Sequence, residues 1–142
     1  MLKLIALDEE DLRIVSAHAQ DAVLRIGDID WRAAERRVVL PMNRFAWEKK
    51  TGLLRGGPER RNAVLRFERV DAVRSAGIPR DRPDAVLSLL AIRFTPADPP
   101  SGAIELVFSG EGALRLEAEC IEAELADLGG AWEALARPRH PD

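Results

Sequence analysis

Few residues in this 142-residue sequence suit catalysis, and their spacing matches no catalytic motif. The two histidines are His18 and His140, and the single cysteine is Cys120. A general base needs a positioned partner, and no Gly-x-Ser-x-Gly turn surrounds Ser16. Cys120 lies where a strand is expected to pass into a helix, and a helix N-terminus would lower the pKa of its thiol and activate it. Free cysteines are, however, more often buried as small apolar residues. We therefore predict no catalytic residue.

The evidence in the sequence for a metal or cofactor site is equally weak. The two histidines lie far apart, and with one cysteine they match no ligand spacing. The acidic run of residues 8–11 suits the positive start of a helix better than a cation, because adjacent carboxylates do not converge on one point. Residues 56–58 lack the glycine spacing and the following Lys of a phosphate loop. The sequence thus predicts no metal and no cofactor.

One cluster suggests binding, a basic segment with interleaved aromatic rings. Residues 30–69 carry 11 basic and 5 acidic side chains, a net charge of +6, whereas the whole chain carries −3. Guanidinium groups bind carboxylates and phosphates through paired hydrogen bonds, and aromatic rings anchor interfaces. The alternative is that these charges pair with the protein's own acidic face and that Trp47 packs in the core. The predicted binding residues are Arg36, Arg37, Arg44, Trp47, Lys49 and Lys50.

Composition narrows the class of protein. With 46% apolar and 32% charged residues, the chain is expected to form one soluble domain, residues 1–142, with a real core. The net charge of −3 and the absence of Tyr disfavour nucleic acid as a partner. No apolar run approaches the ~20 residues that span a bilayer. One cysteine and the lack of a signal peptide indicate a cytoplasmic location.

The N-terminal half shows a helix and several short strands. Asp8 is a candidate N-cap for a helix over roughly 9–19, which follows a short alternating strand. Residues 23–26 and 38–42 are two further extended segments that could pair as a hairpin. Residues 48–61 combine three glycines and a proline, which predicts a long loop before the next strand. The inward-facing apolar positions of that strand switch from odd to even residue numbers near Glu68 and Arg69, where a β-bulge is expected.

The C-terminal half carries the clearest patterns. Residues 86–94 form the most apolar run, which predicts a central strand covered on both faces or a strand passing through the core. Residues 104–108 and 114–118 flank a glycine-containing turn and predict a β-hairpin. From about residue 119 the apolar spacing changes to three and four, which predicts an acidic amphipathic helix over 119–132.

Five stretches of the sequence resemble an uncharacterised domain family of alphaproteobacteria, and the resemblance spans nearly the whole chain. They are Leu2–Asp8, Ser16–Val23, Asn43–Glu48, Leu87–Phe94 and Glu119–Glu122. The resemblance implies a small bacterial cytoplasmic protein. It implies no particular activity, cofactor or catalytic residue.

Together these elements predict an α+β domain. Its antiparallel sheet is expected to be strongly bent and to contain about six or seven strands, with an N-terminal helix and a C-terminal helix. A helix after a final hairpin also suggests a pleckstrin-homology-like barrel, in which the helix plugs one open end. That likeness rests on element order and says little about function.

The leading functional hypothesis is a non-enzymatic binding or adaptor module that recognises an acidic protein partner through the basic, aromatic-containing surface. The alternative is a small-molecule sensor or a small enzyme with a pocket in the curved sheet. Anionic lipid is a third candidate ligand, which the net charge disfavours. A homodimer through an exposed strand edge is also left open.

Overall fold

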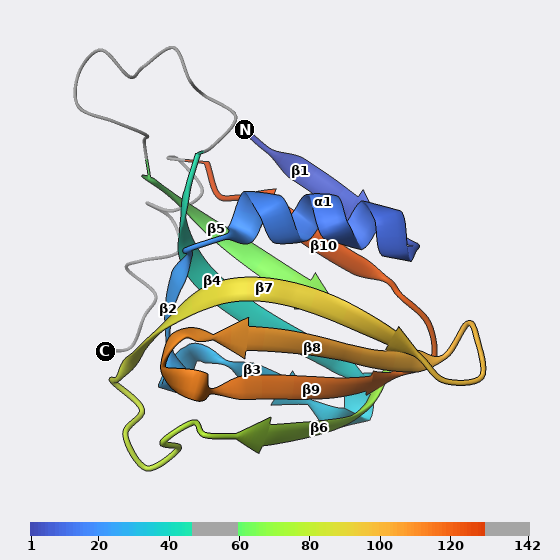
Figure 1. Ribbon diagram of the computed structural model, residues 1–142. Coiled ribbons are helices and arrows are strands. Elements are labelled where there is room, and N and C mark those ends of the chain that lie inside the picture. Colours follow the sequence, from blue (N-terminus) through green and yellow to red (C-terminus); the bar gives the residue numbers. More distant parts are fainter. Residues whose placement is uncertain (47–59, 130–142) are drawn as a thin grey trace.

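The computed structural model describes residues 1–46 and 60–129 and shows a largely antiparallel sheet with one α-helix packed on it (Figure 1). The strands follow the order β1-β10-β5-β4-β2-β7-β8-β9-β6, and β3 pairs with β4 outside this path. The elements are β1 Lys3–Ala6, α1 Glu9–Ala19, β2 Val23–Arg25, η1 Ile26–Asp28, β3 Asp30–Arg32, η2 Ala33–Glu35, β4 Arg37–Phe45, β5 Arg60–Phe67, β6 Val70–Ala76, β7 Val86–Pro96, β8 Gly102–Phe108, η4 Ser109–Glu111, β9 Ala113–Ala118 and β10 Ala123–Asp127.

The N-terminal helix lies where the sequence predicted it. Asp8 is the N-cap of α1, and its carboxylate accepts a hydrogen bond from the backbone N–H of Asp11 at 2.8 Å. This bond satisfies one of the free amides in the first turn. The buried stripe of the helix, which packs against β7, comprises Leu12, Val15 and Ala19. In the part of the chain that the structure describes, no helix has the length and apolar character needed to cross a bilayer.

The predicted C-terminal helix is wrong over the described residues, because β10 is a strand inserted between β1 and β5. Ile121 and Leu125 lie four residues apart, an even spacing that agrees with both the helical and the strand period. With Ala123 between them, they are buried in the core. Pairing on both sides outweighs the helix preference of the Ala and Glu residues in this segment. Residues 130–132 of the predicted helix lie outside the described residues.

The pleckstrin-homology-like barrel is not confirmed, since the sheet does not close. β6 meets the segment before β4 only at the start of β6, where the Val70 N–H donates to the Arg36 carbonyl at 2.9 Å. Beyond that hydrogen bond, β3 and β6 each pair with one strand, β4 and β9 respectively. The sheet has ten strands rather than six or seven, because strands as short as β2 and β3 leave little alternation in the sequence.

The apolar run at 86–94 forms β7, which lies between β2 and β8 but is not covered on both faces. Val86 is 61% exposed and Leu90 is 43% exposed. The register with β8 shifts between Leu89 and Ala91. That irregularity breaks the period-two alternation, so a half-exposed strand resembles a fully buried one in the sequence.

Two connections also differ from the prediction. The phase change at residues 68–69 is a break between β5 and β6, where Arg69 has a φ of +60°, rather than a bulge within one strand. β2 and β4 do pair antiparallel, with Val23 opposite Asn43. They do not form a simple hairpin, because β3 lies between them in the chain and pairs with β4 as well.

Candidate functional site

Arg36 and Arg37 lie near the surface, and the structure pairs both with the protein's own carboxylates. Arg36 Nη2 donates to Asp71 Oδ1 at 2.7 Å and to Glu119 Oε1 at 2.8 Å. Arg37 Nε donates to Glu68 Oε2 at 2.9 Å. The hydrogen bonds to Glu119 and Asp71 raise the pKa of Arg36 above its ordinary value. An anionic partner would have to compete with these carboxylates.

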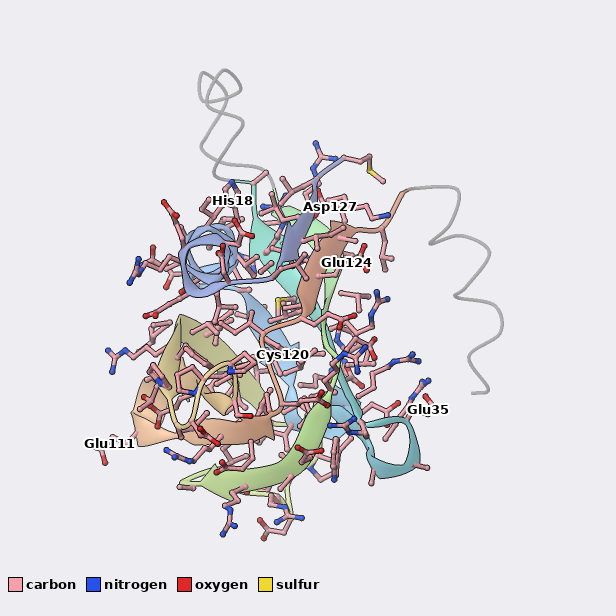
Figure 2. All side chains as sticks on the ribbon, turned by 90° about the vertical axis from the view of Figure 1, so that its right-hand side faces the viewer. His18, Glu35, Glu111, Cys120, Glu124 and Asp127 are labelled. Carbon is pink, nitrogen blue, oxygen red and sulfur yellow. The ribbon has the colours of Figure 1, made fainter. Side chains whose placement is uncertain are left out.

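Arg44 is a core residue. Its side chain is 0% exposed, and its Nε and Nη2 donate to the two carboxylate oxygens of Asp127 at 2.8 and 2.9 Å. Asp127 lies at the end of β10 near the N-terminal strand, and it also accepts the Leu2 N–H at 3.0 Å (Figure 2). Burial opposes the ionisation of Asp127, but these hydrogen bonds and the charges of Arg44 and Arg61 outweigh burial and lower the pKa of Asp127.

The predicted binding residues therefore do not form one described patch. Arg36 and Arg37 lie at the start of β4, and Arg44 is buried near its other end. Trp47, Lys49 and Lys50 lie outside the residues that the structure describes. Anion binding by this segment stays a prediction.

The side chains best suited to catalysis lie on separate parts of the molecule. Figure 2 shows His18 on α1, well away from Cys120. His18 Nδ1 is 2.9 Å from the carbonyl oxygen of Ile14, one turn earlier in the helix. Cys120 is a free, partly buried thiol in the connection from β9 to β10. Across residues 1–46 and 60–129, no group of three or more His, Cys, Asp or Glu side chains could hold a metal ion.

A pocket of about 280 Å³ lies between β3 and β6, where no sequence pattern indicated a site. One wall comes from η1 and β3, the opposite wall from β6 and β9, and the connection between β6 and β7 supplies the rest. The lining residues are Ile26, Gly27, Ile29, Trp31, Val73, Ser75, Ile78, Arg80, Pro83 and Leu114. Most of these lining residues are apolar.

The pocket exists because β6 meets η2 at one end and is unpaired with β3 beyond it. Register places Trp31 opposite the buried Val38 on β4 and Ser75 opposite the buried Leu114 on β9. Residues opposite each other in a ladder share a face of the sheet, so Trp31 and Ser75 lie on its inner face. The open seam of the sheet thus becomes a concave site.

Backbone contacts hold the β6–β7 connection against η1. The Gly27 N–H donates to the Pro83 carbonyl at 2.7 Å, and the Ile26 N–H donates to the Ala85 carbonyl at 2.9 Å. A Cβ at position 27 would lie 2.9 Å from both Cβ and the carbonyl oxygen of Pro83, so the close approach requires glycine. These contacts fix one wall of the pocket before any ligand enters.

The comparison with known proteins gives a family and no activity. No curated protein matches the chain. A family model described as protein of unknown function (DUF2948) matches residues 2–140. The predicted resemblance to an uncharacterised family is thereby confirmed, while the alphaproteobacterial origin stays a prediction. The chain belongs to the DUF2948 family of proteins of unknown function.

Proposed function

We propose that this domain is a binding module that takes a small, largely apolar ligand into the pocket between β3 and β6. The supporting observation is a concave site, lined mostly by apolar residues, with one wall fixed by the backbone bonds of Ile26 and Gly27. Ligand sites are usually concave and mostly apolar, with a few polar groups, and measure ~300–1,000 Å³. At about 280 Å³, this pocket would hold about nine waters at ~30 Å³ each, which suits one small molecule.

Binding is favoured over catalysis by the chemistry of the lining. Its ionisable side chain is Arg80, and Ser75 carries its only hydroxyl among the described lining residues. An arginine stays protonated in proteins and is not available as a general base. A serine needs an adjacent base to become a nucleophile, and no His, Asp, Glu, Cys or Lys is among the described lining residues.

Recognition of an acidic protein by the basic segment is retained as a second prediction. Arg36 and Arg37 are partly exposed and adjacent, which favours it. Their pairing with Asp71, Glu119 and Glu68 weighs against it, since a partner must displace these carboxylates. Replacing Arg36, Arg37, Lys49 and Lys50 by Glu is expected to abolish capture of such a partner from lysate, and unchanged capture would remove the hypothesis.

Several broader expectations also stay predictions. They are a single domain over residues 1–142, a cytoplasmic location in a bacterium, and self-association through an exposed strand edge. β1 is such an edge, since it pairs with β10 alone among the described strands. Its short length and the exposed Lys3 are features that protect edge strands from pairing.

The proposed pocket can be tested with a neutral probe, phenylacetamide, followed by NMR of backbone amides. We expect shifts at Trp31, Val73 and Ser75, because these residues line the site. A Ser75→Phe variant should lose these shifts, since the phenylalanine ring would fill the pocket. The substitution lies in an edge strand, β6, and strands tolerate aromatic residues. Arg74→Phe is the matched control, because Arg74 lies on the opposite, exposed face of β6. Shifts that persist in Ser75→Phe would contradict the proposal.

A further inference from the structure

The polar side chains that line the pocket all carry hydrogen-bond donors. These donors are the indole N–H of Trp31, the hydroxyl of Ser75 and the guanidinium of Arg80. Of these groups only the hydroxyl can also accept a hydrogen bond. Within residues 1–46 and 60–129, none of the three makes a side-chain hydrogen bond or ion pair. The site therefore offers donors that a ligand rich in acceptors would satisfy.

Arg80 differs from Arg32 and Arg37, which are already paired. Arg74 and Arg82 also lack a carboxylate partner among the described residues, but they do not line the pocket. Arg32 Nε lies 2.8 Å from Asp30 Oδ2 on the same strand, β3. Arg37 Nε lies 2.9 Å from Glu68 Oε2. Arg80 is exposed at the rim of the pocket and has no such carboxylate among the described residues. Its charge is available to an incoming anion.

The rest of the lining residues are mostly apolar and disfavour a strongly hydrated ion. Ile29, Val73 and Leu114 present hydrocarbon, and the Trp31 ring adds a large apolar surface. A ligand that satisfies both the donors and this lining has an apolar body and one anionic end. We infer that the pocket binds a small apolar carboxylate whose carboxylate pairs with Arg80, an inference that rests on the proposed function.

A carboxylate fits the rim better than a phosphate. One guanidinium neutralises the single charge of one carboxylate, with which it can form two parallel hydrogen bonds. A phosphate ester carries more negative charge than a carboxylate. The exposed Asp28, Asp81 and Asp84, which are close in sequence to the lining residues Gly27, Arg80 and Pro83, would therefore repel it more strongly. Arg80 alone lines the pocket as a cation among the described residues.

The test compares phenylacetate with phenylacetamide, which have the same shape and differ in charge, by calorimetric titration near neutral pH. Hexanoate and hexanamide form a second pair for an aliphatic occupant. In the unmodified protein we expect the carboxylate to bind about fivefold more tightly than the amide, the scale of a solvent-exposed ion pair. Arg80→Gln should remove this preference. Arg82→Gln, the control, removes an exposed charge from the same loop and should keep it.

The outcomes separate the two proposals. Equal binding of acid and amide to the unmodified protein would overturn the carboxylate assignment and leave the pocket proposal standing. A preference that survives Arg80→Gln, or that is lost equally in Arg82→Gln, would overturn the role of Arg80. If no probe of either pair binds, the proposed function itself fails and the inference fails with it.

Discussion

At the scale of single residues, the buried pair of Arg44 and Asp127 is the most consequential polar interaction. It joins β4 to β10, and the Leu2 N–H on Asp127 adds the start of the chain. Both side chains are almost completely buried, at 0% and 2% exposure. A buried charge costs little while it is paired and a great deal once its partner is removed. We therefore expect this pair to determine whether β4, β10 and the start of the chain stay together.

Replacing Arg44 by Met leaves the Asp127 carboxylate buried without its guanidinium partner, and among the described residues only the Leu2 N–H and the charge of Arg61 still favour its ionised form. We expect the free energy of unfolding in urea to fall by about 3 kcal/mol or more. Arg36→Met, which breaks an exposed pair, is the control and should change stability little. Adding Asp127→Leu to Arg44→Met should restore part of the loss, because it removes the unpaired charge. Equal effects of Arg44→Met and Arg36→Met would contradict this role.

The lowered pKa of Asp127 also predicts a pH dependence. Because the folded pKa lies below the ordinary value of 3.8, the unfolded chain takes up the proton first as pH falls. The contribution of Asp127 to stability is therefore complete above that value and is lost as pH falls through the folded pKa. Urea midpoints of the unmodified protein should fall more steeply below about pH 4 than those of Asp127→Asn. Parallel pH profiles of the two proteins would contradict the prediction.

At the scale of elements, sequence patterns succeeded where the signal is local. The N-cap at Asp8 and the apolar stripe behind it defined α1, and the glycine turn after Phe108 defined the β8–β9 hairpin. Sequence patterns failed for β10, because its partners β1 and β5 lie about 120 and 60 residues earlier in the chain. The spacing of Ile121 and Leu125 agreed with either period, and only distant pairing decides between them.

A matched pair of threonine substitutions tests the strand assignment of β10. Threonine favours strands and is disfavoured in helices relative to alanine. Ala126→Thr on β10 should leave thermal stability unchanged or raise it. Ala17→Thr, at an exposed position of α1, should lower stability by about 0.5 kcal/mol. A loss at position 126 equal to that at position 17 would indicate a helix instead.

At the scale of the whole molecule, the uneven charge of the sequence is reflected in its packing. Basic residues of the middle segment meet acidic residues from the C-terminal segment, as in Arg36 with Glu119 and Arg66 with Glu124. Arg69 Nε similarly lies 3.0 Å from Glu122 Oε1. Among the described residues, the alternative interpretation of the basic segment, pairing with the protein's own acidic face, explains these contacts. Sequence alone could not decide this, because it does not show which strands become neighbours.

The candidate site was the least predictable feature. A pocket in the curved sheet was among the hypotheses, but its residues come from three separate stretches of the chain, 26–31, 73–83 and 114, and β3 is only three residues long. Trp31 was assigned to the basic segment, whereas its register opposite Val38 places it on the inner face. The site arises where the sheet fails to close, and that is a property of the assembled molecule.

The most direct measurement is a crystal structure of the protein with phenylacetate. We expect the phenyl ring between Trp31 and Val73 and the carboxylate within hydrogen-bonding distance of the Arg80 guanidinium. This result would establish both the pocket and its preference for an anion. An empty pocket, with phenylacetate bound instead beside Arg36 and Arg37, would contradict the proposal and favour the basic surface as the binding site.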